Sequence, residues 1–250
     1  MDSHHEASEL AQALSPSDDA ASGQERWQLA QNVTDFATRR FPADVLAVGV
    51  HGPLAHGDIR EGTDINVVIV TYRSGRGLAS SVRQIDGWIV NMSVFSADEY
   101  MRAAQTLEIG WPLIADQFLN AKALFDQAGF YQQLRDTHLS RLASAGSREF
   151  SALARQAWCE AASLHRRAAR SSEWFDSDGA LMLLAQARAQ TAIVDGLMSR
   201  TYFRGSADAG RRTGVSGLDL QALGERLSQQ AATLSDRGQP VDASIAELFA

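Results

Sequence analysis

The segment GVHGPLAHGDIREGTDINVVIV, residues 49–70, combines two short apolar runs with a polar connection rich in glycine and histidine. The run VLAVGVH at 45–51 and the run DINVVIV at 64–70 have the length and β-branched content of buried strands. Gly52 and Pro53 follow the first run and favour a turn. The segment therefore predicts two strands joined by a polar loop.

The flanking residues extend this pattern. Apolar residues recur at helical spacing over 25–41, and Pro42 ends that helix. The stretch GWIVNMSVF at 87–95 predicts a third strand. Ser96 then begins a helix, with Glu99 three residues later as the second member of a capping box.

Composition divides the chain into three parts. Residues 1–22 are polar and are expected to form a disordered or weakly helical tail. Residues 23–127 form an α/β domain, in which the loop before the third strand is expected to be a mobile flap. Residues 128–250 are rich in strong helix formers. The fold class is therefore predicted as α+β, a mixed sheet with helices followed by a helical bundle, with bundle helices at 129–143, 148–171, 178–203 and 218–234.

Charge and composition exclude several classes of function. The net charge of −7 implies no broad basic surface for nucleic acid. No apolar run reaches the length of a membrane span, and the N-terminus lacks the pattern of a secretory signal. The single cysteine, Cys159, excludes an internal disulfide and fits a reducing compartment. We therefore expect a cytoplasmic protein that binds neither nucleic acid nor membranes.

Polar side chains gather where the predicted strands begin. Asp64 and Asn66 are two residues apart on one strand, so their side chains are expected to face the same side. Asn91 lies on the next predicted strand and is placed to face them. Three such groups have the geometry of a magnesium site, yet only Asp64 carries a charge, whereas Mg²⁺ prefers carboxylate oxygens.

The segment at 49–70 and four later segments resemble the kanamycin nucleotidyltransferase family, the aminoglycoside-modifying branch of the nucleotidyltransferase superfamily. The resemblance is collinear over most of residues 25–215. It implies a nucleotidyltransferase-like domain, a helical domain and a homodimer. The later segments are GWIVNMSVFSADEY at 87–100, WPLIADQF at 111–118, ALFDQAGFYQQL at 123–134 and GLMSRTYFRGSA at 196–207.

The departures from the family pattern lie at its chemical centre. Asp64 matches the first metal ligand, but Asn66 and Asn91 stand where the second and third carboxylates are expected. Pro53 stands at the serine of the phosphate-binding turn and lacks both a hydroxyl and a backbone N–H. His56 stands near a position that is basic in the family. The metal site is therefore interpreted as degenerate, and no cofactor is expected.

Glu160 falls where the resemblance places a catalytic base. Ala157 and Leu164 are apolar helical neighbours, so partial burial is expected, and burial raises a carboxyl pKa to a value that suits acid–base work. The alternative is a surface glutamate paired with Arg155 or Arg167.

His51 and His56 leave a further alternative open. Together with Asp64 they offer ligands for a softer metal such as zinc, although a hydrogen-bonding role is the preferred interpretation.

Three hypotheses of function follow. The preferred one is a metal-independent acid–base enzyme, of cyclase, lyase or isomerase type, acting on a small molecule in bacterial specialised metabolism. The second is a catalytically silent small-molecule-binding protein, and the third is an active aminoglycoside nucleotidyltransferase that uses Mg-ATP. The preferred hypothesis assigns catalysis to Glu160 and Asp64, and substrate binding to Asn66, Asn91, His51 and His56.

Overall fold

The computed structural model describes residues 16–58, 62–73 and 77–248, which divide into two compact units. The first unit extends to Gln105 and includes 117–138, and the second comprises 106–116 and the chain from Leu139. Helices α5 (Trp111–Leu119) and α6 (Phe130–Ser144) cross this division. The boundary predicted at residue 128 falls in the turn that precedes α6.

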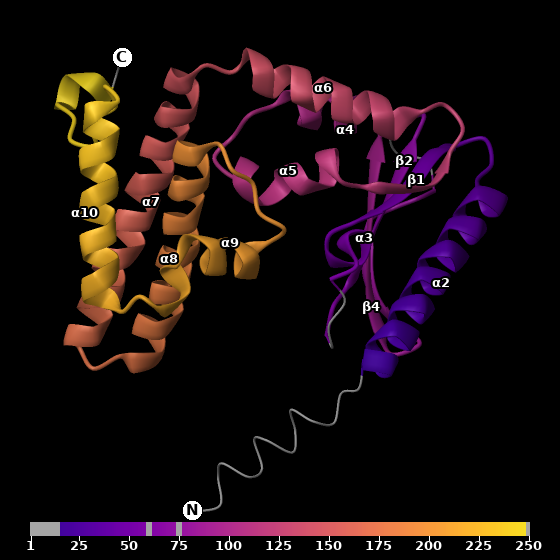
Figure 1. The fold of residues 1–250 in the computed structure, drawn as a ribbon, viewed down its shortest axis with the longest axis horizontal. Helices are drawn as coiled ribbons and strands as arrows, with labels where there is room; N and C mark the ends of the chain where they lie inside the picture. The colour runs from indigo at the N-terminus through magenta and orange to yellow at the C-terminus, as the bar shows by residue number, and fades with distance from the viewer. Residues whose placement is uncertain (1–15, 59–61, 74–76, 249–250) are drawn as a thin grey trace, which may run out of the picture. The chain divides into compact units, whose positions relative to one another are not determined.

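A mixed sheet forms the centre of the first unit (Figure 1). Its strand order is β3-β4-β2-β1-β5. The neighbours β2 and β4 run parallel, and the other neighbouring strands run antiparallel. The three predicted strands are confirmed as β1, β2 and β4, and the fold is α+β as predicted. The strands are β1 (Val45–His51), β2 (Ile65–Thr71), β3 (Ser81–Ile85), β4 (Trp88–Ser96) and β5 (Lys122–Asp126).

Helix α2 (Pro16–Arg40) covers one face of the sheet. Ala30 of the helix and Val67 of β2 belong to one buried apolar cluster, which ties helix and sheet together. The helix begins earlier than predicted, so residues 16–22, expected as the end of the tail, are helical. The rest of the predicted tail, residues 1–15, lies outside the described residues.

Tyr131 of α6 covers part of the opposite face of the sheet. A Cβ atom on Gly49 of β1 would lie 2.6 Å from Cζ of Tyr131, so glycine is what admits the ring against the strand. The Tyr131 hydroxyl donates a hydrogen bond to the Val68 carbonyl at 3.1 Å. Burial, with Tyr100 and Asp126 nearby, raises the pKa of Tyr131 well above its usual value. The hydroxyl therefore stays protonated and keeps this bond.

Two strands were missed from the sequence. β3 occupies part of the segment predicted as a mobile flap, and that prediction is wrong for 81–85. Most of β3 is exposed, because it is an edge strand, and its sequence SVRQI carries no apolar alternation. A sequence signal was nevertheless present in the dipeptide Asp86-Gly87, which favours a type I′ hairpin turn. Its φ angles of 51° and 85° are those that such a turn requires. β5 follows α5 directly and adds the opposite edge.

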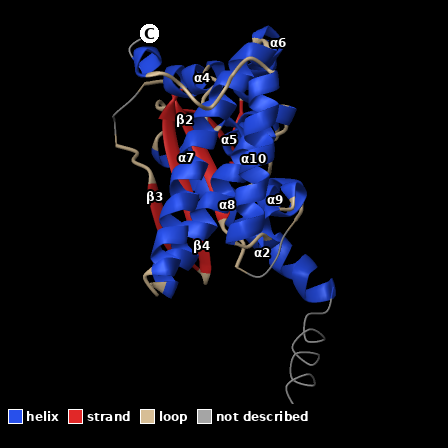
Figure 2. Ribbon diagram, turned by 90° about the vertical axis from the view of Figure 1, so that its left-hand side faces the viewer, coloured by secondary structure: helices blue, strands red, loops and turns tan. Residues whose placement is uncertain are grey.

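The second unit is helical over its described residues, as Figure 2 shows by colour. The predicted bundle helices are confirmed, although α8 ends before residue 203 and a short further helix, α9, was not predicted. Asp219 caps α10 by accepting a hydrogen bond from the Ala222 amide at 2.8 Å. No helix in the described part of the chain is long and apolar enough to cross a membrane. The helices are α7 (Ser147–Glu173), α8 (Ser177–Ser199), α9 (Ser206–Thr213) and α10 (Leu220–Asp236).

The capping box predicted at Ser96 is confirmed at the start of α4 (Ala97–Gln105). The Ser96 amide and hydroxyl donate to Glu99 Oε2 at 3.0 Å and 2.7 Å, and the Glu99 amide donates to Ser96 Oγ at 3.3 Å. The hydroxyl and amide of Ser96 together hold the pKa of Glu99 below its ordinary value of 4.5. The box therefore contributes stability while Glu99 is ionised.

The substitution Ser96→Ala is expected to lower the free energy of unfolding by about 1 kcal/mol at neutral pH. Because the pKa of Glu99 is depressed in the folded state, its stabilising contribution is complete above its ordinary value and is lost as the pH falls through the lowered pKa. Urea unfolding at neutral and at acidic pH measures both effects, with Ser172→Ala, at an exposed position of α7, as the control. A difference between wild type and Ser96→Ala that does not shrink on acidification would contradict this account.

Candidate functional site

Three polar side chains lie in register across adjacent strands of the first unit. His51 of β1 pairs with Asn66 of β2 in the antiparallel ladder, and Asn66 pairs with Asn91 of β4 in the parallel ladder. Directly paired residues point to the same face of a sheet, so the three side chains form one row. All three are partly exposed. We call His51, Asn66 and Asn91 the polar row.

The polar row lies on the sheet face opposite α2. Ile65 and Val67, which flank Asn66 in sequence, are buried in the cluster beneath α2. Side chains alternate along a strand, so Asn66 points to the other face. Val68 is two residues further along β2 and therefore points to the same face as Asn66. It pairs with Gly49, where Tyr131 covers the sheet. On this face of the sheet, the apolar surface under Tyr131 and the hydrogen-bonding group of Asn66 are therefore only two residues apart along β2.

The turn after β1 borders the polar row. Gly52 adopts φ 72° and ψ −153°, which favours glycine, and a Cβ atom there would lie 3.2 Å from Asn66 Nδ2. The Asn66 amide thus lies against this turn. Pro53 begins the one-turn helix α3 (Pro53–His56), where it offers an anion neither a hydroxyl nor an N–H.

Asp64 lies directly before β2 and is partly exposed. It is two residues from Asn66 along the chain, which places a carboxylate beside the middle member of the polar row. His56 ends α3 and is also partly exposed. Glu61, in the same connection, lies outside the described residues.

The donor set does not fit a catalytic Mg²⁺ site. Asn66 and Asn91 are neutral amides, so Asp64 supplies the negative charge of this set, whereas a magnesium–triphosphate site is usually built from several carboxylates. Among the described residues, no three His, Cys, Asp or Glu side chains are grouped so that they could hold a metal ion. His51, His56 and Asp64, the alternative zinc ligands, are not grouped in this way in the described residues.

Glu160 lies on α7 in the second unit and is exposed, so the predicted partial burial is wrong. At about 100° per residue, the buried alanines of α7 form one stripe, and Glu160 lies about 60° beyond its edge at Ala157. Cys159, the residue before Glu160, is exposed as well. The described residues include no ion pair between Glu160 and Arg155 or Arg167. The buried alanines nearest to it are Ala154, Ala157 and Ala161.

Sequence reasoning missed a basic pocket in the second unit. Its arginines come from α9, from α10 and from the residue after α10, and no local motif joins these positions. The members of the polar row, in contrast, lie in or next to segments that strand periodicity identifies.

The chain was compared with protein-family models, with curated proteins and with solved structures, and the solved structures give a match. No protein-family model and no curated protein matches the chain. Among solved structures, the chain is similar to a nucleotidyltransferase-like protein from Exiguobacterium sibiricum 255-15. The two chains share 10% sequence identity with a TM-score of 0.41, over 84% of this chain and 75% of the other. This similarity assigns no role to an individual residue.

Proposed function

We propose that the polar row binds a small organic molecule through neutral hydrogen bonds, and that the protein acts on it by metal-independent acid–base chemistry. The reaction type is a cyclisation, elimination or isomerisation, in bacterial specialised metabolism. The supporting observation is the register of His51, Asn66 and Asn91 on three adjacent strands. In this proposal the nucleotidyltransferase-like architecture is kept, while metal and triphosphate chemistry is lost.

The chemistry of the row favours a polar, uncharged ligand surface. Each asparagine amide has an oxygen that accepts and a nitrogen that donates, so Asn66 and Asn91 can bind hydroxyl, carbonyl or amide groups. Neighbouring strands are about 4.8 Å apart, so the three side chains span about 10 Å. This span matches a molecule of one or two rings.

Two carboxylates are proposed to move protons. Asp64 borders the row and is accessible, so it can accept a proton from a molecule bound there. Glu160 is proposed from the family resemblance, and its exposure leaves the carboxylate open to a substrate. A homodimer and a cytoplasmic location are further proposals, from the resemblance and from the single Cys159 respectively.

A catalytically silent binding protein is the second candidate function. The exposure of Glu160 favours it, because the burial expected to tune this carboxylate for proton transfer is not seen. The two candidates share the binding site and differ in turnover.

The wild-type protein is expected to show no magnesium-dependent binding of ATP. The reasons are the neutral amides at Asn66 and Asn91 and the missing donors at Pro53. Calorimetric titrations with ATP in Mg²⁺ and in EDTA measure this, and their difference isolates binding through the metal from binding to basic side chains elsewhere. Micromolar affinity that requires Mg²⁺ would contradict the proposal and support an active aminoglycoside nucleotidyltransferase.

A further inference from the structure

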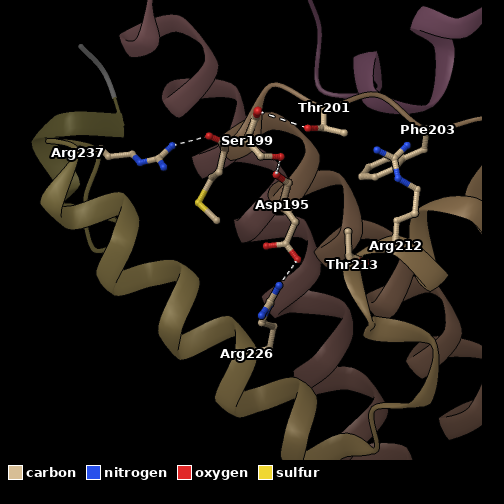
Figure 3. Close-up of a pocket in the computed structure, with 9 residues that line it drawn as sticks. Asp195, Ser199, Thr201, Phe203, Arg212, Thr213, Arg226 and Arg237 are labelled. Carbon is tan, nitrogen blue, oxygen red and sulfur yellow. Dashed lines mark hydrogen bonds and ion pairs between the residues drawn. The ribbon is translucent and has the colours of Figure 1, made fainter.

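The helical unit contains an open pocket of about 480 Å³. Three arginines line it: Arg212 on α9, Arg226 on α10 and Arg237 directly after α10. Figure 3 shows Arg237 and Arg212 on opposite sides of the pocket, with Asp195 and Arg226 between them. The pocket lies wholly within the second unit.

Asp195 is already occupied by neighbours. Arg226 Nη2 donates to Asp195 Oδ2 at 2.8 Å, and Gln230 Nε2 donates to Asp195 Oδ1 at 2.8 Å. Both oxygens of this carboxylate therefore have protein donors, and its charge is balanced by Arg226. The two other arginines keep their charge in the pocket.

Arg237 is held by a neutral acceptor. Its Nη1 donates to the Met198 carbonyl at 2.8 Å, near the C-terminal end of α8. This bond orients the guanidinium and caps a helix end, but it does not cancel the positive charge. The cation also interacts favourably with the negative end of the α8 dipole, and it keeps its charge while doing so.

Arg212 is oriented in a similar way. Its Nη1 donates to the Tyr202 carbonyl at 3.0 Å, and its guanidinium carbon lies 5.1 Å from the centre of the Phe203 ring. The approach to Asp208 is long, 3.5 Å, and Arg211 binds the same carboxylate at 2.9 Å. Asp208 is thus shared by two arginines, so the three side chains together carry a net positive charge.

An adjoining pocket of about 740 Å³ shares Met198, Ser199 and Arg237 with the first and adds Arg148 and Arg200. Arg200 has a left-handed backbone, φ 53°, and its Nη2 donates to Ser147 Oγ at 2.8 Å. We call the joined surface the arginine groove. Its arginines are Arg148, Arg200, Arg212, Arg226 and Arg237.

We infer that the arginine groove binds a small molecule that carries two acidic groups, phosphate or carboxylate. A local excess of positive charge in a chain of net charge −7 concentrates anions at this surface. Guanidinium groups bind both kinds of oxyanion through paired N–H donors. Arg212 and Arg237 are already oriented by backbone carbonyls, so less side-chain entropy is lost on binding. The ligand site is separate from the polar row and does not depend on the proposed function.

Calorimetry with pyrophosphate and with citrate, on the whole protein at low salt, tests the inference. Saturable binding is expected for at least one of the two, and it should weaken as salt is added. Arg237→Gln and Arg212→Gln should each reduce the affinity about tenfold or more. Gln retains an N–H donor for the carbonyl, so folding should persist, and thermal unfolding checks this.

Arg211→Gln is the matched control. Like Arg212→Gln, it removes one positive charge from α9 and one ion-pair partner from Asp208. Arg211, however, does not line the groove. Arg237→Lys keeps the charge but lacks the paired N–H donors, so it should bind more weakly than wild type and more tightly than Arg237→Gln. Tighter binding of pyrophosphate identifies a phosphate ligand, and tighter binding of citrate a carboxylate one. The inference is overturned if neither anion saturates, or if Arg211→Gln weakens binding as much as Arg212→Gln and Arg237→Gln do.

Discussion

The double variant Asn66→Asp with Asn91→Asp is expected to bind Mg²⁺ at least about 100-fold more tightly than the wild type, because two added charges strengthen the attraction for a divalent cation. The pairing of Asn66 with Asn91 places the new carboxylates on adjacent strands, and Asp64 is two residues from Asn66 along the chain. Aspartate has the shape of asparagine, so the change alters charge with little change in packing. The variant thereby rebuilds the acidic set that the family resemblance leads one to expect.

Two measurements follow from the same electrostatics. In EDTA the double variant should unfold at a lower temperature than the wild type, because like charges on paired strands repel. Mg²⁺ should restore the unfolding temperature and should give a saturable heat in calorimetry. Asn32→Asp with Asn120→Asp adds the same charge elsewhere and is the control. Equal Mg²⁺ affinity in the two double variants would contradict the placement of Asn66 and Asn91.

Restored metal binding is not expected to restore nucleotidyl transfer. Pro53 still lacks the hydroxyl and the N–H at the turn that Gly52 forms beside Asn66. Efficient transfer to an aminoglycoside by the double variant would show that Pro53 is not an obstacle.

Local sequence signals predicted the elements that carry the polar row. Strand periodicity identified β1, β2 and β4, and Ser96 with Glu99 identified the start of α4. The same periodicity put Asp64 and Asn66 on one face of a strand, which is short-range geometry that a single sequence contains. The register that pairs Asn66 with Asn91 joins β2 to β4 across β3, which intervenes in the sequence, and the structure supplies it.

Features that depend on long-range packing were missed. The edge strands β3 and β5 have few buried side chains to give them an apolar pattern. Glu160 was expected at the edge of a buried stripe, and an offset of about 60° around the helix axis leaves it in solvent. The arginine groove joins residues from Arg148 to Arg237, whose proximity depends on how the bundle helices pack.

Glu160→Gln is expected to lower the turnover of the proposed acid–base reaction by about 10²- to 10⁴-fold, the usual contribution of such a group. The amide keeps the shape of the side chain and removes the proton that the carboxyl group gains and loses. Because Glu160 is exposed on α7, the substitution should leave the unfolding temperature unchanged. Substrate affinity should change little, since the amide keeps the shape of the side chain.

Proton transfer can be detected before the substrate is known. A carboxylate that removes a proton from carbon and later returns one will introduce deuterium in D₂O, so mass spectrometry of a library of polar small molecules reports each substrate by its mass gain or by a new product. Glu173→Gln, an exposed acid on the same helix, is the control and should retain wild-type turnover. Normal turnover by Glu160→Gln would remove this residue from the mechanism, and loss of wild-type turnover in EDTA would contradict metal independence. A wild type that binds a ligand at the polar row without labelling or converting any molecule would instead support the silent binding protein, because Asp64 and the amides can hold a ligand without moving its protons.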